Sequence, residues 1–209
     1  MLEKRSRNLG KWLPSLYDLA MKPFEKRKFR KIREALLQKA TGRVLEIGAG
    51  TGVNFPLYQL VEKVDAIEPN PDMSQQANEK KTSSSVPICI HQQFAENLDF
   101  PDDTFDSVVA TLVFCSIPDP EKALLEIKRV SKPNATVLFF EHVKMEQRGL
   151  ALAQDILNPT WKRLFGGCHL NRDTLQIIQD SGLQIKNVTS HYKGLFLAIE
   201  SENEKHKEK

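Results

Sequence analysis

The residues best suited to chemistry follow the first strong apolar run of the chain, Val44–Ile47. Glycines stand at every second position after it, at Gly48, Gly50 and Gly52, and Glu46 precedes the first glycine by two residues. Glycines at this spacing let the backbone turn tightly and approach a bound molecule closely. A carboxylate beside the turn suits a cationic group, such as the ammonium of an aminoacyl ligand. The pattern predicts a small-molecule site at the end of a strand.

Two common nucleotide sites do not fit this segment. A nicotinamide dinucleotide fingerprint requires Gly or Ala five residues after its first glycine. Val53 holds that position here, and Gly52 comes one residue early. The carboxylate of Glu46 would also repel a pyrophosphate. No Gly-Lys-Ser/Thr follows the glycines, so a P-loop is excluded as well.

A second carboxylate stands at the end of the next apolar run. Glu68 comes 22 residues after Glu46 and is followed by Pro69. A carboxylate at this spacing can accept hydrogen bonds from both hydroxyls of a ribose. For Glu68 alone, the alternative is an acid at a helix N-terminus, where the helix dipole favours negative charge. Together with Glu46 and the glycines, Glu68 favours a ligand that contains a ribose.

Few side chains are candidates for a direct role in a reaction. His142 follows the fifth apolar run, at the strand end where ligands bind in open α/β sheets, so it is either a substrate-facing base or orienter, or a structural hydrogen-bonded histidine. Cys115 fits a small packing residue better than a nucleophile. Cys168-His169 has neither a Cys-x-x-Cys spacing nor a carboxylate partner, so no metal site is expected.

Strands and helices alternate in the elements that must position these residues. Short apolar runs predict strands at 44–47, 64–67, 86–90, 106–112 and 135–140. The clearest helix is Pro120–Val130, where Ala123, Leu124, Ile127 and Val130 recur at helical spacing. Strands that alternate with helices predict an α/β fold, a doubly wound and mostly parallel sheet with helices on both faces.

The C-terminal part breaks this alternation. Residues 171–181 read as a helix that ends at Gly182, and strands are expected at 183–188 and 195–199. Only six residues separate these two strands, and a crossover helix needs a dozen or more. The last two strands are therefore expected to form an antiparallel β-hairpin at the edge of the sheet.

The glycine segment resembles the first motif of the class I S-adenosylmethionine-dependent methyltransferases. Residues 94–106 are similar to that family's AE-x-LPF-x-D-x-SFD segment, whose Ala and Glu lie against the adenine, and residues 111–119 to the segment that lines the methionine end of the cofactor. The resemblance implies a Rossmann-like sheet of seven strands and S-adenosyl-L-methionine as the cofactor. The cofactor-binding residues that it implies, together with the residues singled out above, are Glu46, Gly48, Ala49, Gly50, Gly52, Glu68, Pro69, Ala95, Glu96, Thr111 and Leu112.

A narrower resemblance is to the methyltransferase-like thiol S-methyltransferases. Their patterns CTLV-x-CSV, EHV, DP-x-W and GC-x-LTRE are matched by residues 110–117, 141–143, 158–161 and 167–173, with Asn158 in place of Asp and Asn171 in place of Thr. This resemblance implies direct in-line methyl transfer to a small apolar acceptor such as a thiol, which depends mainly on positioning the reactants. Members of that family begin with an apolar membrane anchor, which we do not expect in this chain.

Other acceptors stay open at this point. The chain is also similar to ubiquinone- and menaquinone-type methyltransferases, so a quinone C-methyltransferase or a phospholipid N-methyltransferase is an alternative. A module that binds the cofactor without turnover is a further one, but the intact Glu46, glycines and Glu68 argue against decay of the site. No nucleic-acid partner is expected, because residues 41–209 carry a net charge of −5 and duplex binding favours a basic stripe.

The basic residues gather near the start of the chain. Residues 1–40 hold twelve Lys or Arg and four acidic residues, a net charge of +8 in a chain of +3. They are expected to form an N-terminal helical lid over the acceptor, with weak contact to an anionic membrane; the alternative is a solvated helix surface. Residues 41–200 form the predicted S-adenosylmethionine-binding domain, and 201–209 a frayed charged tail.

The rest of the composition is ordinary for a globular protein. The chain has 209 residues, of which 40% are hydrophobic and 27% charged, enough for one well-packed core. No run approaches the roughly 20 apolar residues that span a bilayer, and no secretory signal is expected. Three separated cysteines fit reduced thiols in the cytoplasm. Nothing in the sequence sets an oligomeric state.

Overall fold

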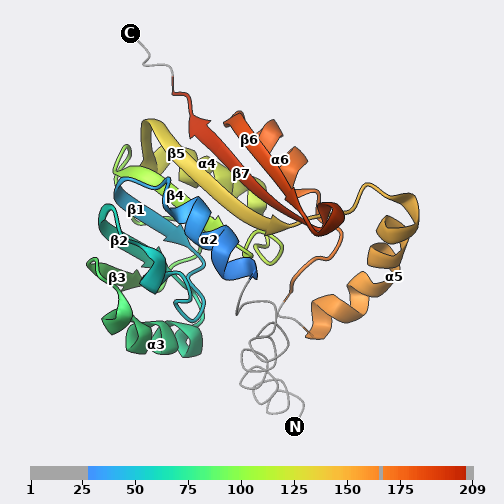
Figure 1. Ribbon diagram of the computed structural model, residues 1–209, viewed down its shortest axis with the longest axis horizontal. Helices are drawn as coiled ribbons and strands as arrows, with labels where there is room; N and C mark the ends of the chain where they lie inside the picture. The colour runs from blue at the N-terminus through green and yellow to red at the C-terminus, as the bar shows by residue number, and fades with distance from the viewer. Residues whose placement is uncertain (1–27, 165–166, 206–209) are drawn as a thin grey trace.

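The fold is a seven-stranded sheet covered by helices on both faces (Figure 1). The structure is a computed structural model that describes residues 28–164 and 167–205. In chain order, the strands are β1 (Gly42–Ile47), β2 (Val61–Ile67), β3 (Ile88–His91), β4 (Phe105–Thr111), β5 (Ser131–His142), β6 (Gln184–His191) and β7 (Phe196–Asn203). The α-helices are α2 (Arg30–Leu37), α3 (Pro71–Lys80), α4 (Pro120–Val130), α5 (Arg148–Leu164) and α6 (Thr174–Asp180).

The sheet has the predicted parallel core and antiparallel end. Its strand order is β3-β2-β1-β4-β5-β7-β6, and the pairs among the first five strands are all parallel. The β6–β7 hairpin is antiparallel, as the short link predicted, but only β6 lies at the edge, because β7 inserts between β5 and β6. Since β1, β2, β4 and β5 are parallel, the loops after them lie at one edge, which we call the carboxyl edge.

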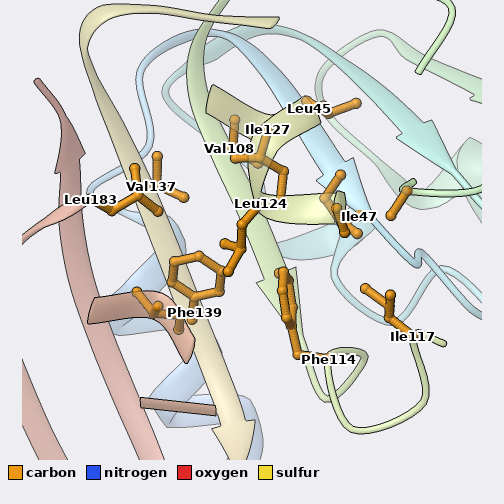
Figure 2. Close-up of a cluster of buried hydrophobic side chains, with 14 of the residues drawn as sticks. Leu45, Ile47, Val108, Phe114, Ile117, Leu124, Ile127, Val137, Phe139 and Leu183 are labelled. Atoms are coloured by element: carbon orange, nitrogen blue, oxygen red, sulfur yellow. The ribbon is translucent and has the colours of Figure 1, made fainter. Parts of the chain in front are cut away.

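Each face of the sheet has its own hydrophobic core, since strand side chains alternate between the faces. On one face, Leu124 and Ile127 of α4 pack on strand residues such as Val108 and Phe139 (Figure 2). On the other, Phe29 and the leucines of α2 pack with residues such as Val109, Leu138 and Phe140. The helix 120–130 begins and ends where the sequence predicted. The two cores make the central strands rigid supports for the loops at the carboxyl edge.

The start of the chain enters the core earlier than predicted. Phe29, Leu36 and Leu37 are 1–3% exposed and belong to the core on the α2 face. Residues 29–40 are therefore part of the folded domain rather than a separate lid. The rest of the predicted lid falls on residues 1–27, which lie outside the described residues.

The end of the chain is held more firmly than the predicted frayed tail implies. β7 continues to Asn203, so residues 201–203 belong to the sheet. Ser201 Oγ donates to the carbonyl of Val137 (2.9 Å), and Asn203 Nδ2 donates to Ser131 Oγ (2.8 Å). Lys205 Nζ donates to the carbonyls of Arg129 and Ser131, both at 2.8 Å. Within this segment, Ser201 and Asn203 are buried, whereas Glu202 is half-buried and Glu204 is exposed.

Helix α5 was not predicted, and it extends away from the sheet (Figure 1). Its large apolar side chains Leu152, Ile156 and Leu157 are 58–68% exposed. Among its residues, only Gln154 is buried, and it binds the backbone of Val143 and Met145. In the described part of the chain, no helix combines the length and the hydropathy needed to cross a membrane.

Candidate functional site

The glycine segment forms a loop at the carboxyl edge of β1. Gly48, Gly50 and Gly52 all adopt positive φ, between 56° and 75°, a conformation that costs other residues about 1–2 kcal/mol. A Cβ on Gly48 would lie 2.2 Å from Val113 Cγ2, and one on Gly52 would lie 2.8 Å from the ring of Phe55. These two glycines are required by packing within the protein.

Gly50 is different, because a Cβ built on it would meet no atom within 4 Å. The backbone at Gly50 therefore lines open space, and its φ of 56° suits glycine. An open glycine at the tip of the loop after β1 allows a cofactor to approach the backbone closely. The loop therefore has room for a bound molecule beside Gly50, and the neighbouring Ala49 is 3% exposed.

Glu46 lies under this loop and is 1% exposed. Its Oε1 accepts a hydrogen bond from Asn54 Nδ2 (2.9 Å), and its Oε2 accepts one from the hydroxyl of Tyr58 (3.1 Å). Asn54 Nδ2 also donates to Thr111 Oγ1 (3.0 Å), which joins β1 to β4. Burial raises the pKa of Glu46 to about 7, against hydrogen bonds that lower it. A nearby cation would favour the ionised form.

Glu68 lies at the end of β2 and is 6% exposed. Its Oε2 accepts from the backbone N–H of Gly50 (2.9 Å), and its Oε1 accepts from that of Asn70 (2.8 Å). Glu68 therefore holds the glycine loop against the start of α3. This role is additional to the contact with a ribose that the sequence predicts. Each oxygen keeps a second lone pair for a ligand hydroxyl. Pro69 is exposed beside it, at the turn into α3.

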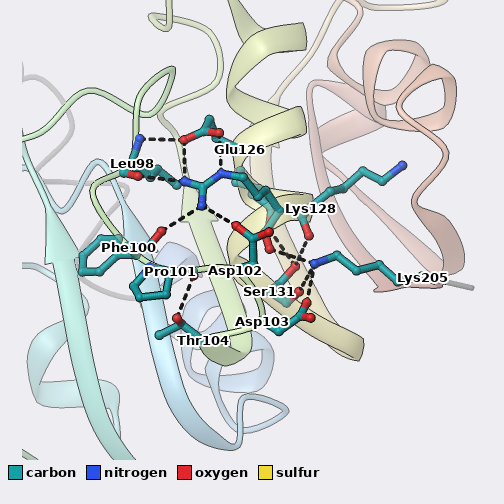
Figure 3. A network of polar contacts seen from close by, with 12 residues as sticks. Leu98, Phe100, Pro101, Asp102, Asp103, Thr104, Glu126, Lys128, Ser131 and Lys205 are labelled. Atoms are coloured by element: carbon teal, nitrogen blue, oxygen red, sulfur yellow. Dashed lines mark hydrogen bonds and ion pairs between the residues drawn. The ribbon is translucent and has the colours of Figure 1, made fainter. Parts of the chain in front are cut away.

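The segment after β3 brings Ala95 and Glu96 to the same edge. Ala95 is 5% exposed, and Glu96 Oε1 accepts from the backbone N–H of Asp119 (3.3 Å). Arg129 of α4 holds the chain that follows by donating to the carbonyls of Leu98 and Phe100, both at 2.8 Å (Figure 3). The same guanidinium pairs with Glu126 and Asp102, also at 2.8 Å. A single side chain thus fixes the segment that is expected to contact the adenine.

We expect Arg129→Met to lower the free energy of unfolding by about 2–3 kcal/mol, since it leaves the two carbonyls and the Glu126 carboxylate without their charged partner. The melting temperature should fall by about 5–10 °C, as measured by thermal unfolding. Lys132→Met removes an exposed ion pair with Asp106 and should cost less than about 1 kcal/mol. Equal stability losses in the two variants would show that Arg129 is only another surface ion pair.

Thr111 ends β4, and Leu112 begins the loop between β4 and α4. Thr111 is 9% exposed, and Leu112 has a φ of 54° while its N–H donates to the carbonyl of Phe140 (2.7 Å). Glu141 supports the same loop, because its two carboxylate oxygens accept from the N–H groups of Val113 (3.1 Å) and Phe114 (3.2 Å). Burial raises the pKa of Glu141 to about 8.

The segment after α5 braces this loop from the other side. Arg172 Nη1 donates to the carbonyls of Phe114 and Ile117, the second at 2.7 Å. The N–H of His169 donates to the carbonyl of Cys115 (2.8 Å). The loop expected to surround the methionine end of the cofactor is therefore fixed by β5 on one side and by residues 169–172 on the other.

His142 ends β5 and is 9% exposed, yet neither ring nitrogen has a hydrogen-bond partner. The alternative expected from the sequence, a structural histidine held by hydrogen bonds, is therefore not observed for His142. Its side chain lies on the same face of the sheet as Glu46 and Thr111, two strands from Glu46. Burial lowers the pKa of His142 to about 4. The imidazole is therefore neutral near pH 7 and is too weak a base to take a proton from an acceptor such as a thiol.

Cys115 is 5% exposed, and a hydrogen bond to Cys168 together with burial raises the pKa of its thiol. A protonated thiol is a poor nucleophile, which agrees with a packing role. Within residues 28–164 and 167–205, no three His, Cys, Asp or Glu side chains are grouped to hold a metal ion.

Five residues of this edge were not predicted from the sequence: Asn54, Tyr58, Glu141, Arg172 and Tyr192. Glu141 and Arg172 lie in the segments 141–143 and 167–173 that resemble the thiol S-methyltransferases, although no role was predicted for either. Asn54 and Tyr58 contact Glu46 from the segment after β1, and nothing in the sequence indicates this contact. The sequence-predicted residues, in contrast, all lie on the loops or strand ends of one edge.

Comparison with known proteins agrees with this arrangement. Residues 45–139 match the family model described as a methyltransferase domain. The chain is 40% identical over 145 residues to thiol S-methyltransferase TMT1B of Rattus norvegicus, covering 65% of this chain and 57% of that protein. It is 32% identical over 158 residues to the phosphatidylethanolamine N-methyltransferase of Cereibacter sphaeroides, covering 75% and 76%.

Solved structures agree on the fold. A SAM-dependent methyltransferase from Thermotoga maritima superposes with a TM-score of 0.67 at 16% identity, covering 94% of this chain and 99% of that one. The chain spans less than two thirds of the rat relative, whereas the match covers most of the bacterial one. The 32% identity to the bacterial relative, which covers 75% and 76% of the two chains, agrees with the seven-stranded sheet and the methyltransferase domain and shows that the chain belongs to the class I S-adenosylmethionine-dependent methyltransferases.

Proposed function

We propose that this enzyme transfers the methyl group of S-adenosylmethionine to the sulfur of a small, apolar thiol. When bound, the cofactor supplies an activated methyl carbon, so the protein has to align the acceptor with it rather than create a reactive intermediate. Gly50 would receive the cofactor backbone, Glu68 the ribose, and Glu46 with Asn54 would lie toward its cationic end. Ala95 and Glu96 would lie beside the adenine, and Thr111 and Leu112 beside the methionine.

The observation that carries the choice of a thiol is the 40% identity to the rat thiol S-methyltransferase. A thiol, with a pKa of about 8.5 for cysteine, loses its proton more readily than an alkylammonium group at about 10.4, so its proton can pass to solvent before the thiolate attacks. With a pKa of about 4, His142 can orient such an acceptor but cannot serve as its base at pH 7.

A second candidate is N-methylation of a phospholipid. The 32% identity to the bacterial phosphatidylethanolamine N-methyltransferase supports it, and so do the exposed apolar side chains of α5, Leu152, Ile156 and Leu157. Exposed apolar side chains of this kind are typical of surfaces that meet another apolar phase.

Turnover of methyl-labelled S-adenosylmethionine tests the proposal. The acceptors are thiophenol, octanethiol, phosphatidylethanolamine vesicles and a benzohydroquinone, each with enzyme and with no enzyme. We expect the label in the thioether products of the two thiols at a rate at least tenfold above that of the other acceptors. Preferential labelling of the vesicles or of the hydroquinone would overturn the thiol in favour of that class.

Glu46 predicts a pH dependence of cofactor binding. Its pKa of about 7 should fall when the cationic part of the ligand approaches, because an adjacent positive charge favours the carboxylate. Binding then releases a proton, so the affinity for S-adenosylhomocysteine should rise about tenfold from pH 6 to pH 8. Titration calorimetry in buffers of different ionisation enthalpy measures both effects. Glu46→Gln should flatten the profile, and an equally steep profile in that variant would assign the titration to another group.

A further inference from the structure

Tyr192 is a half-buried side chain with a buried hydroxyl that the proposed reaction has not used. Its hydroxyl is shielded from solvent and has no hydrogen-bond partner, like the two ring nitrogens of His142. A buried polar group without a partner costs free energy, so native proteins seldom keep one without a reason. A ligand that bonds to these atoms would remove that cost.

The backbone that carries Tyr192 is strained. Tyr192, Lys193 and Gly194 form the turn between β6 and β7, with φ values of 52°, 59° and 92°. Two successive residues with side chains in the left-handed region are uncommon and unfavourable. Strain of this kind persists where the surrounding structure requires it, and it is concentrated at functional sites.

The turn lies at the carboxyl edge next to His142. In the sheet, Phe196 pairs with His142 of β5 and with His191 of β6. The ring of Phe196 is 5.9 Å from that of His142 and 5.8 Å from that of Tyr192, measured between centroids. Phe196 therefore contacts both unpartnered side chains. Because β5 is adjacent to β4, this cluster adjoins the loop that follows Thr111.

The surroundings of these two side chains are aromatic. Phe29 lies 4.8 Å from Phe196 and 5.7 Å from Tyr192 between ring centroids, and 5.3 Å from Phe140. The charged group placed against Tyr192 is Lys28, whose Nζ lies 5.6 Å from the ring centroid. Apolar walls with a few polar atoms are typical of sites for small, largely apolar molecules.

We propose that Tyr192 and His142 form the polar part of the acceptor subsite, where they bind the reacting group of an apolar acceptor beside the packed rings of Phe29 and Phe196. The Tyr192 hydroxyl donates a hydrogen bond to the acceptor atom, and the neutral imidazole of His142 supplies a second bond. Tyr192 is thus a specificity-determining residue. This inference rests on the proposed methyl transfer but not on the acceptor being a thiol.

The test uses Tyr192→Phe, which removes the hydroxyl and keeps the ring. The KM for the acceptor should rise about tenfold, while kcat changes less than threefold and the affinity for S-adenosylhomocysteine stays within twofold. Because the hydroxyl has no partner in the protein, the melting temperature should stay the same or rise. The matched control is His191→Gln, one residue earlier on the same hairpin, which should leave the acceptor KM within twofold.

The measurement is made with whichever acceptor class the labelled-methyl screen turns over, so a wrong choice of the thiol does not affect it. An arm without turnover titrates thiophenol, or the hydroquinone, into enzyme saturated with S-adenosylhomocysteine. We expect at least fivefold weaker binding in Tyr192→Phe and in His142→Asn than in the unmodified enzyme. An unchanged acceptor KM and affinity in Tyr192→Phe, or a loss of stability that accounts for the defect, would overturn the subsite. Absence of all turnover in the unmodified enzyme would instead contradict the proposed function.

Discussion

Gly50→Val is expected to reduce the affinity for S-adenosylhomocysteine more than a hundredfold while the domain stays folded. A Cβ at this position meets no protein atom within 4 Å, so the added side chain enters the space that we assign to the cofactor. The positive φ of 56° adds a folding cost of about 1 kcal/mol for a residue other than glycine. Titration calorimetry measures the affinity, and thermal unfolding shows whether the domain is folded.

Two other glycines separate the loss of the site from a general effect of substitution. Gly48→Ala places a Cβ 2.2 Å from Val113 Cγ2 and should lower stability by about 1–3 kcal/mol through overpacking. Gly149→Val lies in α5, where a Cβ also meets no atom within 4 Å, and it should leave the affinity unchanged. If Gly50→Val binds S-adenosylhomocysteine as tightly as Gly149→Val does, the cofactor does not lie on this loop.

Glu68→Ala is expected to weaken S-adenosylhomocysteine binding tenfold to a hundredfold. The change would remove the charge-assisted hydrogen bonds that we propose between Glu68 and the ribose, worth about 1.5–3 kcal/mol. It also frees the N–H of Gly50, which the carboxylate holds at 2.9 Å, so the loop loses part of its support. Binding is measured by calorimetry, and hydrogen exchange at Gly50 reports the loosening of the loop.

The control for this variant is Glu62→Ala, an exposed acid on the same strand. It should change neither the affinity nor the exchange rate at Gly50. An affinity for S-adenosylhomocysteine that is the same in Glu68→Ala as in the control would mean that the ribose is bound elsewhere. Faster exchange with unchanged affinity would leave Glu68 with only its role as the support of the loop.

Much of the fold could be predicted because parallel strands are buried on both faces and appear as short apolar runs. The predicted strand bounds were wrong where tertiary contacts, rather than the local sequence pattern, decide where a strand begins or ends. β5 begins at Ser131, earlier than expected, although Lys132-Pro133-Asn134 resembles a turn and Asn134 has a φ of 62°. β7 extends to Asn203 because that side chain bonds to Ser131 across the sheet.

Helix α5 shows a different limit. Its apolar residues Leu152, Ile156 and Leu157 are exposed, so they do not mark a face that packs on the sheet, and Pro159 lies inside the helix. Periodicity predicts a helix well when one face is buried in the core, as in α4. Within the described residues, the apolar side chains of α5 pack on no part of the core, so their spacing did not predict a helix.

The site shows which functional residues a sequence can reveal. Gly50 and Glu68 could be found because their spacing is local. Asn54 and Tyr58 could not, since nothing in their sequence indicates that the segment after β1 returns to the buried Glu46. Strand alternation also separates Glu141 from His142, as the first supports the β4–α4 loop and the second lies on the opposite face of the sheet with Glu46.

The most direct test of the central claim, that the carboxyl edge binds S-adenosylmethionine through the Gly50 loop and Glu68, is a calorimetric titration of the unmodified protein. S-adenosylhomocysteine and NAD are titrated separately under the same conditions. We predict saturable one-to-one binding of S-adenosylhomocysteine and negligible binding of NAD, because Val53 interrupts the dinucleotide pattern and Glu46 disfavours a pyrophosphate. Tighter binding of NAD than of S-adenosylhomocysteine would contradict the account.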